Sequence, residues 1–397
     1  MNKEYILQLL EKNNPWWKNE YKLNFKNRKA YEEIKKFLHT RQIISLTGLR
    51  RTGKTTIMKK IIEEYLQKYP KENIIYFTFD ESEEERLMNI LDIYSTFMKK
   101  DLNNEKILFL FDEVQRVKNW SEQLKTIYDL YPNIKFIISG SESLFIRKKT
   151  RESLAGRIFE FKIHPLYFKE FLSFREKKFD NLNLYKNELL NELNRYLICY
   201  GFPEIINESE EICEKYIQEN VIEKILFNDI PQLVPVGDVS ILGQILKIIL
   251  NEPWQIINLA ELANTIGISR QTASLYLEYL EKSFLIKKLY NYSKNERKTQ
   301  KRYKKYYPTI ISRLLLNNPD KFGKAFETFL INELNAEFFW RDAYKNEVDI
   351  IKTEPLTAIE IKSGEVKERD LTSLHIFSKK FKPKKAIVLS YEIEKKL

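Results

Sequence analysis

The chain has 397 residues, of which 43% are hydrophobic, and it carries a formal net charge of +11 at pH 7. Ordinary domain sizes predict two or three domains for a globular chain of this length. No apolar run is long enough to span a bilayer, and residues 1–13 lack the apolar core of a signal peptide, so we expect a cytoplasmic protein without membrane contact. Cys199 and Cys213 have no CxxC spacing, which argues against a disulfide framework and a zinc site.

The sequence pI is about 9.1. Such a basic excess favours a polyanionic partner. Usage rich in Lys, Glu and Ile is also typical of a biased base composition or a hot habitat, so charge alone leaves the partner open.

A phosphate-binding loop is predicted within residues 41–58, which read RQIISLTGLRRTGKTTIM. An apolar strand, the spacing GxxxxGK[ST] and a helical pattern follow one another in the order that this motif requires. Loop N–H groups can surround a phosphate, Lys54 can reach the β and γ phosphates, and the Thr55 hydroxyl can hold Mg²⁺. The sequence therefore predicts an ATP site formed by Gly48, Leu49, Arg50, Arg51, Thr52, Gly53, Lys54, Thr55 and Thr56.

A second part of this site is predicted at residues 107–115, ILFLFDEVQ. A continuous apolar run that ends in acids is typical of a buried parallel strand whose carboxyl end faces a ligand crevice. We expect Asp112 in the Mg²⁺ shell and Glu113 as the group that polarises the attacking water. The alternative is a plain acidic strand end, and it is weakened by the P-loop that precedes this run.

Two more strands are predicted at 73–81 and 133–143. The first ends at Asp80 and Glu81, and the second reaches Ser139, a candidate sensor of the γ-phosphate. Because these runs alternate with helical stretches, an α/β domain with a parallel sheet wrapped by helices is expected.

Two arginines, Arg151 and Arg157, follow the sensor strand. Either could reach the γ-phosphate of a neighbouring subunit, and we prefer Arg157. The alternative is an unpaired surface arginine, and spacing alone does not decide between them.

The segment from about 180 to 250 is predicted to be helical and shows no catalytic pattern. After it, Gly267 and Ser269 separate two short helical patterns, the second with Leu275 among its expected buried residues, and the strand 284–290 follows. A winged helix is the natural interpretation. Arg270 and Gln271 lie early on its second helix, where such modules meet DNA, although many winged helices serve as protein contacts or ATPase lids.

A basic stretch follows at residues 293–307, SKNERKTQKRYKKYY. Its cations can neutralise phosphates, and its tyrosines can stack on exposed bases. The alternative is a solvated wing tip; seven cations within twelve residues favour nucleic acid. The candidate DNA-binding cations are Lys294, Arg297, Lys298, Lys301 and Arg302, followed by Lys304 and Lys305.

The last quarter contains a predicted helix with Glu327 and the predicted strands EVDII, 347–351, and AIEIK, 358–362. Strand alternation places Glu360 and Lys362 on one side, and Asp349 can approach them if the two strands pair. Asp349 and Glu360 could then hold Mg²⁺ or Mn²⁺, while Lys362 stabilises developing charge, as in a metal-dependent nuclease. A charged hairpin is the alternative.

Over nearly its whole length the chain resembles archaeal and bacterial AAA-type P-loop ATPases, related to the STAND group, that carry a C-terminal domain of unknown function. The matching segments are GLRRTGKTT, LFDEVQRVKNW, SGSESLF, SLAGRIFEFKIHPLYFKEF, GFPE, FETFLINEL, EVDII and IEIKSG. The resemblance implies that SLAGR supplies Arg157. It also implies that the tail is similar to PD-(D/E)xK nucleases, whose catalytic positions match Glu327, Asp349, Glu360 and Lys362, with EVD in place of the Pro-Asp pair.

The sequence therefore predicts an α/β protein with an AAA-type ATPase domain at 1–175, a helical module at 176–245, a winged helix at 246–310 and a nuclease-like domain at 311–397. The leading hypothesis is an ATP-dependent, homo-oligomeric DNA-processing enzyme that cleaves branched or ended DNA with Mg²⁺ or Mn²⁺. The alternative is a regulatory ATPase switch whose C-terminal domain binds nucleic acid or a protein without cleaving it. A stand-alone transcription factor is weaker, because a repressor needs no Walker B acids.

Overall fold

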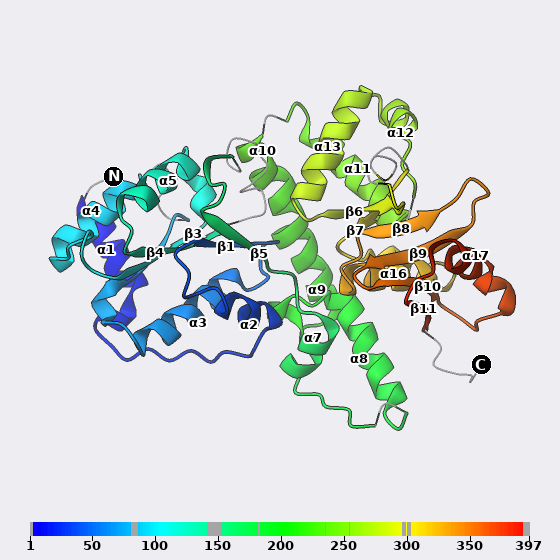
Figure 1. Ribbon diagram of the computed structural model, residues 1–397, viewed down its shortest axis with the longest axis horizontal. Coiled ribbons are helices and arrows are strands. Elements are labelled where there is room, and N and C mark those ends of the chain that lie inside the picture. The colour runs from blue at the N-terminus through cyan, green and yellow to red at the C-terminus, as the bar shows by residue number, and fades with distance from the viewer. Residues whose placement is uncertain are drawn as a thin grey trace. The chain divides into compact units, whose positions relative to one another are not determined.

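The computed structural model describes residues 3–80, 86–140, 152–181, 183–234, 236–253, 255–295, 299 and 303–391. The chain forms two compact units (Figure 1). Unit one comprises Met1–Lys178 and Phe202–Glu204, and unit two comprises Phe179–Gly201 and Ile205–Leu397.

Unit one is built on a five-stranded parallel sheet with the strand order β2-β3-β4-β1-β5. Every residue of β1 and β3 is buried. This is the pattern of a parallel sheet covered on both faces, and it explains why the predicted apolar runs are continuous rather than alternating. The strands are β1 (Ile43–Thr47), β2 (Ile74–Thr78), β3 (Ile107–Asp112), β4 (Ile134–Gly140) and β5 (Ile158–Lys162).

Helices cover this sheet, and in Figure 1 α2 and α3 lie below it while α5 lies above it. Helix α3 begins at Lys54, directly after the loop that follows β1, so the first strand and the first long helix position the predicted phosphate loop. The helices of unit one are α1 (Lys3–Asn13), α2 (Lys29–Lys35), α3 (Lys54–Leu66), α4 (Leu87–Met98), α5 (Trp120–Leu130) and α7 (Phe168–Phe174), with short 3₁₀ turns at Pro15–Trp17, Lys71–Asn73 and Val114–Arg116.

Unit two begins with helices and includes a predicted pair of short helices, α12 and α13. Asn258 caps α12 and Ser269 caps α13, as the sequence predicts for Ser269. Leu275 is 41% exposed rather than buried, because Tyr276 and Tyr279 occupy the inner face of α13 instead. The helices are α8 (Lys186–Cys199), α9 (Glu210–Tyr216), π-helical turns Ile217–Glu223 and Ile225–Asp229, α10 (Ile230–Leu233), α11 (Val239–Asn251), α12 (Leu259–Ile266), α13 (Arg270–Lys282), α15 (Arg313–Leu316), α16 (Pro319–Glu333) and α17 (Thr372–Phe381), with 3₁₀ turns at Pro203–Ile205, in which only Ile205 belongs to unit two, and Glu368–Leu371.

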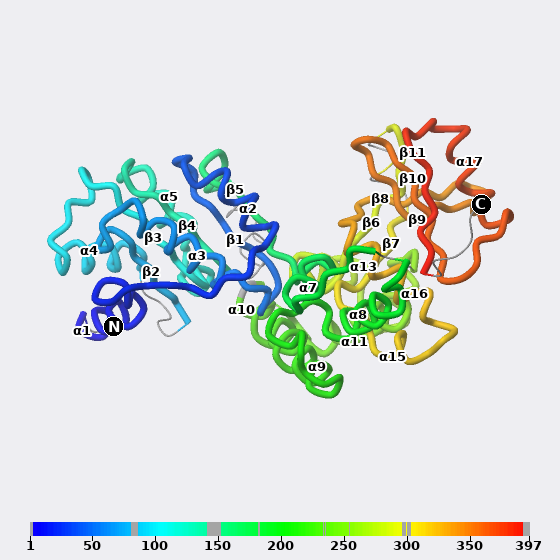
Figure 2. Tube along the Cα trace, turned by 90° about the horizontal axis from the view of Figure 1, so that it is seen from below, coloured from blue at the N-terminus to red at the C-terminus, as the bar shows by residue number. Residues whose placement is uncertain are grey.

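A six-stranded mixed sheet with the order β11-β10-β9-β8-β6-β7 completes unit two. Helix α17 packs against β9 and β10, and Figure 2 shows it beside the C-terminal strands of this sheet. The hairpin β6/β7 joins the C-terminal strands because β6 pairs in parallel with β8, so the two predicted domains 246–310 and 311–397 share one sheet. The strands are β6 (Ile286–Asn291), β7 (Lys304–Pro308), β8 (Phe338–Arg341), β9 (Glu347–Thr353), β10 (Leu356–Lys362) and β11 (Lys385–Ser390).

Among the described residues, none of the helices combines the length and the apolar character that crossing a bilayer requires.

Candidate functional site: a P-loop and a buried charge cluster

The predicted phosphate loop lies at the carboxyl end of β1, as the motif requires. Gly48 and Gly53 both have positive φ angles, 151° and 92°. A Cβ on Gly48 would lie 2.2 Å from the carbonyl oxygen of Ile163, so only glycine fits at this close approach. The loop is therefore shaped by its glycines before any ligand enters.

Within this loop, Lys54 is buried and its Nζ donates to the carbonyl oxygens of Gly48 and Leu49 at 3.1 and 2.9 Å. Thr52 donates from its hydroxyl to the same Leu49 carbonyl at 3.0 Å. The ammonium group thus lies among backbone acceptors inside the loop, where a phosphate can exchange with these carbonyls.

The carboxylate of Asp112 accepts hydrogen bonds from three hydroxyl groups at the carboxyl edge of the sheet. Thr55 Oγ1 and Tyr76 Oη each donate to its Oδ2 at 2.7 Å. The Ser139 hydroxyl donates to its Oδ1. The structure therefore brings together the three predicted residues Thr55, Asp112 and Ser139 as an oxygen-rich set of the kind that Mg²⁺ prefers.

Glu113 follows Asp112 and has a left-handed backbone, with φ at 55°. Its carboxylate accepts a hydrogen bond from the side-chain amide of Gln115. Burial raises the pKa of Glu113, Lys54 opposes this rise, and the negative charge of Asp112 adds to it. A carboxylate with a raised pKa next to the phosphate loop has the properties of a general base.

Three contacting residues were not predicted from sequence: Tyr76, Gln115 and Arg28. Tyr76 sits in an apolar strand run, where an aromatic residue gives no sign of a hydrogen bond. The buried Arg28 donates to the carbonyl oxygens of Thr52 and His164 at 3.0 and 2.8 Å and pairs with Glu170 at 3.2 Å. It therefore anchors the P-loop to the segment after β5, through contacts that no local motif signals.

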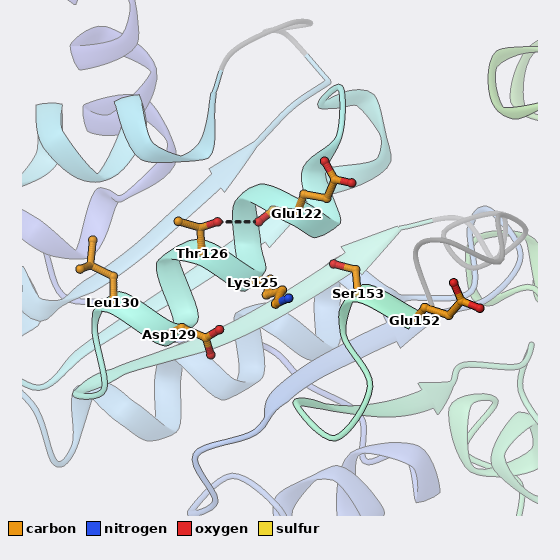
Figure 3. A pocket seen from close by; sticks show the side chains of 7 residues that line it. All are labelled: Glu122, Lys125, Thr126, Asp129, Leu130, Glu152 and Ser153. Atoms are coloured by element: carbon orange, nitrogen blue, oxygen red, sulfur yellow. Dashed lines mark hydrogen bonds between the residues drawn. The ribbon is translucent and has the colours of Figure 1, made fainter.

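The predicted arginine Arg157 lies at the amino end of β1, since its carbonyl accepts a hydrogen bond from Ile43 N at 2.8 Å. The P-loop follows the opposite end of that strand. The guanidinium forms two hydrogen bonds with Asp129 at 2.9 and 3.0 Å, so it is not the unpaired surface arginine of the alternative. Asp129 also borders a hollow of about 880 Å³ shown in Figure 3. A role of Arg157 at the phosphate of a neighbouring subunit stays a prediction, and it requires the guanidinium to leave Asp129 for that phosphate. Arg151 and Glu81 lie outside the described residues.

Arg51, on the P-loop, has φ at 66° and pairs with Glu204 at 3.0 Å. Both side chains are about half exposed, at 48% and 49%. Glu204 lies at the end of GFPE, and Phe202–Glu204 are the three residues of unit one that the chain inserts between two segments of unit two. The other predicted loop residues, Leu49, Arg50 and Thr56, lie within or directly after this loop.

A second group of functional candidates forms a charge cluster in unit two. Tyr307 Oη donates to Glu327 on α16 at 2.6 Å, and the neighbouring Lys305 pairs with Glu347 on β9. Burial lowers the pKa of Lys305, but the charges of Glu327, Glu347 and Asp349 outweigh burial and raise it. Lys305 is 2% exposed, so it belongs to this cluster and is not the surface DNA-binding cation that the basic stretch predicted.

Asp349, Glu360 and Lys362 meet in the same cluster. Lys362 Nζ lies 2.9 Å from Glu360 Oε1, in agreement with the predicted strand alternation. Asp349 Oδ2 accepts a hydrogen bond from Ile361 N at 2.8 Å. Burial, followed by repulsion from Glu327 and Glu360, raises the pKa of Asp349 well above its usual value. The structure therefore brings all four predicted residues into one electrostatic group.

This cluster has one feature that points to a missing partner. The Oε2 atom of Glu360 is buried and has no hydrogen-bond partner among the residues that the structure describes. In the part of the chain that the structure describes, however, no group of three or more His, Cys, Asp or Glu side chains is placed to hold a metal ion. Mg²⁺ commonly uses only one or two carboxylates together with substrate phosphates, so the pair Asp349 and Glu360 is chemically suitable.

The predicted DNA-contacting residues of the helix pair are at the surface. Arg270 and Gln271 are exposed at the start of α13, and Lys294 is exposed after β6. The remaining predicted cations of the basic stretch, Arg297, Lys298, Lys301 and Arg302, lie outside the described residues.

The strand, glycine loop and helix, with Lys54, Thr55 and Asp112 at one edge of a parallel sheet, define a P-loop nucleotide-binding domain. Residues 40–172 match the family model described as the AAA domain, so unit one carries an AAA-type P-loop ATPase domain. Residues 190–309 and 322–395 match two domains of unknown function, DUF8612 and DUF4143.

Similar proteins exist in bacteria and archaea. An uncharacterized protein of Haemophilus influenzae is 30% identical over 269 residues, which cover 66% of this chain and 65% of that protein. An uncharacterized protein of Methanocaldococcus jannaschii is 34% identical over 258 residues, which cover 62% and 56%. The chain thus spans less than two thirds of the length of these curated relatives.

Among solved structures, the chain is similar to a STAND protein with a tetratricopeptide repeat sensor from Pyrococcus horikoshii. The TM-score is 0.33 with 16% identity, and the match covers 79% of this chain and 49% of that chain. At this TM-score the similarity carries no argument about function.

Proposed function

We propose that this chain hydrolyses ATP in unit one and cleaves DNA with a divalent metal ion in unit two. The observation that supports DNA cleavage is the buried Oε2 atom of Glu360, which has no hydrogen-bond partner among the described residues. Glu360 belongs to the same charge cluster as Lys362 and Asp349. A buried carboxylate oxygen without a donor is energetically unfavourable, and a cation relieves it. The preferred substrate is branched or ended DNA.

In ATP hydrolysis, the residues of the P-loop and those at the end of β3 have different roles. Lys54 binds the β and γ phosphates, and Thr55 with Asp112 would hold Mg²⁺, which neutralises phosphate charge when it is bound. Glu113 accepts a proton from the attacking water, and Gln115 fixes the orientation of its carboxylate. In a homo-oligomer, Arg157 of one subunit would approach the ATP of the next.

For DNA cleavage, Asp349 and Glu360 would hold Mg²⁺ or Mn²⁺, which polarises the phosphoryl oxygen and acidifies a bound water. Lys362 offers a cation to the charge that develops on the phosphate. Tyr307 fixes Glu327 by its hydrogen bond, and Lys305 balances part of the negative charge of the cluster. Arg270, Gln271 and Lys294 would contact the DNA backbone or bases, together with the four cations that follow.

A second candidate is a regulatory ATPase switch that binds DNA or a protein without cleaving it. The ion pair between Arg51 and Glu204 favours it, because a nucleotide phosphate competes for Arg51 and would release Glu204. Glu204 lies between two chain segments of unit two, so its release provides a physical route for a nucleotide-dependent change.

The test compares labelled four-way, forked and linear DNA incubated with the purified chain, with and without ATP, in Mg²⁺ or Mn²⁺. Cleavage that is lost in Asp349→Ala and Lys362→Ala supports the nuclease. DNA that binds but stays intact in both metals contradicts cleavage and favours the switch. ATP turnover is measured in parallel and is expected to stop in Lys54→Ala.

A further inference from the structure

A second cavity lies at the edge of the ATPase sheet opposite the P-loop. Its volume is about 470 Å³, within the size range of ligand sites. Its lining includes Ile107 and Ile134, the first residues of β3 and β4, together with residues before β1 and residues at and just after the end of α3. None of the predicted phosphate-, metal- or DNA-binding residues lines this cavity.

The lining of this cavity is strongly basic. Five cationic side chains, those of Lys35, Arg41, Lys68, Lys106 and Lys135, line it with the single carboxylate Glu64, a net charge of +4 with His39 neutral. Glu64 already forms an ion pair with Lys35 at 2.9 Å. No carboxylate of the lining is therefore left to pair with the other four cations, and their combined electric field attracts an anion.

Two of these cations are held in place by the protein. Lys135 Nζ donates to the carbonyl oxygens of Thr40 and Gln42 at 2.7 and 2.5 Å. Arg41 donates to the carbonyl oxygen of Tyr128 at 2.8 Å, and its guanidinium lies 4.3 Å from the centre of that ring. Cations with fixed positions bind an anion with less loss of side-chain entropy than mobile surface lysines do.

Lys135 is also partly desolvated. Burial lowers its pKa to about 8, and no acidic group opposes that effect. In the part of the chain that the structure describes, Lys135 pairs only with backbone carbonyls. A bound anion would supply the counter-charge that this ammonium lacks.

The cavity also has an aromatic wall. The rings of Tyr65 and Tyr69 are stacked, with centroids 5.2 Å apart and planes inclined by 21°. Both side chains are partly exposed and line the cavity beside the cations. A flat aromatic surface next to fixed cations suits a ligand that joins a planar ring to a phosphate, because rings stack on aromatic faces.

We propose that this cavity binds a nucleotide unit, with its phosphate at Lys135 and Lys68 and its base against Tyr69. The unit can be a free nucleotide or the end of a nucleic-acid strand, which share this chemistry. The site is separate from the P-loop, because it lies at the opposite edge of the sheet.

The experiment uses the full chain with Lys54→Ala, which weakens the P-loop as a competing site. Binding of fluorescent AMP and of a 5′-phosphorylated, fluorescein-labelled dinucleotide is followed by anisotropy. We expect at least one probe to bind, and Lys135→Met or Lys68→Glu to weaken it by about tenfold, as for the loss of a charge-assisted hydrogen bond. Tyr69→Ala is expected to weaken it less.

Lys59→Glu is the matched control, since Lys59 is exposed on α3 and does not line the cavity. Binding of AMP alone identifies a free nucleotide as the source, and binding of the dinucleotide alone identifies a strand end. Absence of binding by both probes, or equal loss in Lys68→Glu and Lys59→Glu, overturns the proposal. Lys68 is at the surface, so its variant keeps the test valid if Lys135→Met fails to fold.

Discussion

Tyr307 on β7 donates a hydrogen bond to Glu327 on α16 at 2.6 Å, so residues from both sides of position 310 build one charge cluster. The neighbouring Lys305 is 2% exposed and pairs with Glu347. The cluster therefore depends on a strand that lies outside the matched segment 322–395. This relationship has a direct consequence for stability.

Lys305→Met is expected to lower the free energy of unfolding by about 3 kcal/mol, because it leaves the partly buried carboxylates of Glu327, Glu347 and Asp349 without their cation. Urea unfolding followed by far-UV circular dichroism measures this loss. Lys304→Met is the control, because Lys304 lies 5.8 Å from the ring of Tyr290 and its loss removes only a cation–π contact of about 1 kcal/mol. Equal losses in the two variants would show that Lys305 does not balance the cluster.

Gly48→Ala is expected to abolish tight ATP binding and to lower the melting temperature. The new Cβ would lie 2.2 Å from the carbonyl oxygen of Ile163, so the backbone of the P-loop has to move. Gly243→Ala is a suitable control, because its Cβ meets nothing within 4 Å on α11 and helix propensity favours alanine by about 1 kcal/mol. Titration with a fluorescent ATP analogue gives the binding result, and unchanged affinity in Gly48→Ala contradicts the geometry.

Glu113→Gln is expected to reduce kcat for ATP by at least about 100-fold and to leave KM nearly unchanged, because a glutamine cannot accept the proton of the attacking water. Steady-state phosphate release measures both constants. Asp80→Asn serves as the comparison, since Asp80 is an exposed acid that pairs with Arg116 at 2.9 Å. A Glu113→Gln enzyme with full turnover would remove this residue from the catalytic step.

The stability of unit one is expected to rise between about pH 8 and pH 10.5. Burial lowers the pKa of Lys135 from 10.5 to about 8. Below pH 8 the Lys135 ammonium is charged in both the folded and the unfolded state, so the folded state bears the full free-energy cost of burying this charge. Between pH 8 and pH 10.5 only the unfolded state keeps the proton, so the free energy of unfolding rises with pH. The rise is at most about 3 kcal/mol, because the partial exposure of Lys135 reduces the effect of burial.

Lys135→Met is expected to remove this rise, whereas Lys68→Met keeps it. Melting temperatures at about pH 7.5 and pH 9.5 provide the comparison. The pH dependence of Lys135 is refuted if wild type and Lys135→Met change in parallel.

The sequence predicts where the P-loop residues and the acids lie in the fold, because its signals are local. The glycine spacing, the continuous apolar strands and the acids at the end of β3 are each signals within a few residues, and the parallel sheet then brings Thr55, Asp112 and Ser139 together. Arg28 contacts Thr52 from 24 residues away in the sequence, and no local pattern reveals such a partner.

The charge cluster of unit two could be predicted only in part, because it depends on contacts between residues that are distant in the sequence. Alternation along β10 correctly places Glu360 beside Lys362, since both lie on one strand. The basic stretch made Lys305 look like a surface cation, whereas the parallel pairing of β6 with β8 turns β7 into part of the same sheet. Strand pairing between distant segments decides which cations are buried, and composition carries no information about it.

Metal-dependent cleavage by unit two is measured on labelled forked DNA with the wild type, Lys362→Ala and Lys54→Ala. Chelation with EDTA and Lys362→Ala are each expected to abolish cleavage, while Lys54→Ala abolishes ATP turnover and retains metal-dependent cutting at least in part. Cleavage that persists at the wild-type rate in Lys362→Ala, or intact DNA in every lane despite ATP turnover, would show that unit two is not a metal-dependent nuclease.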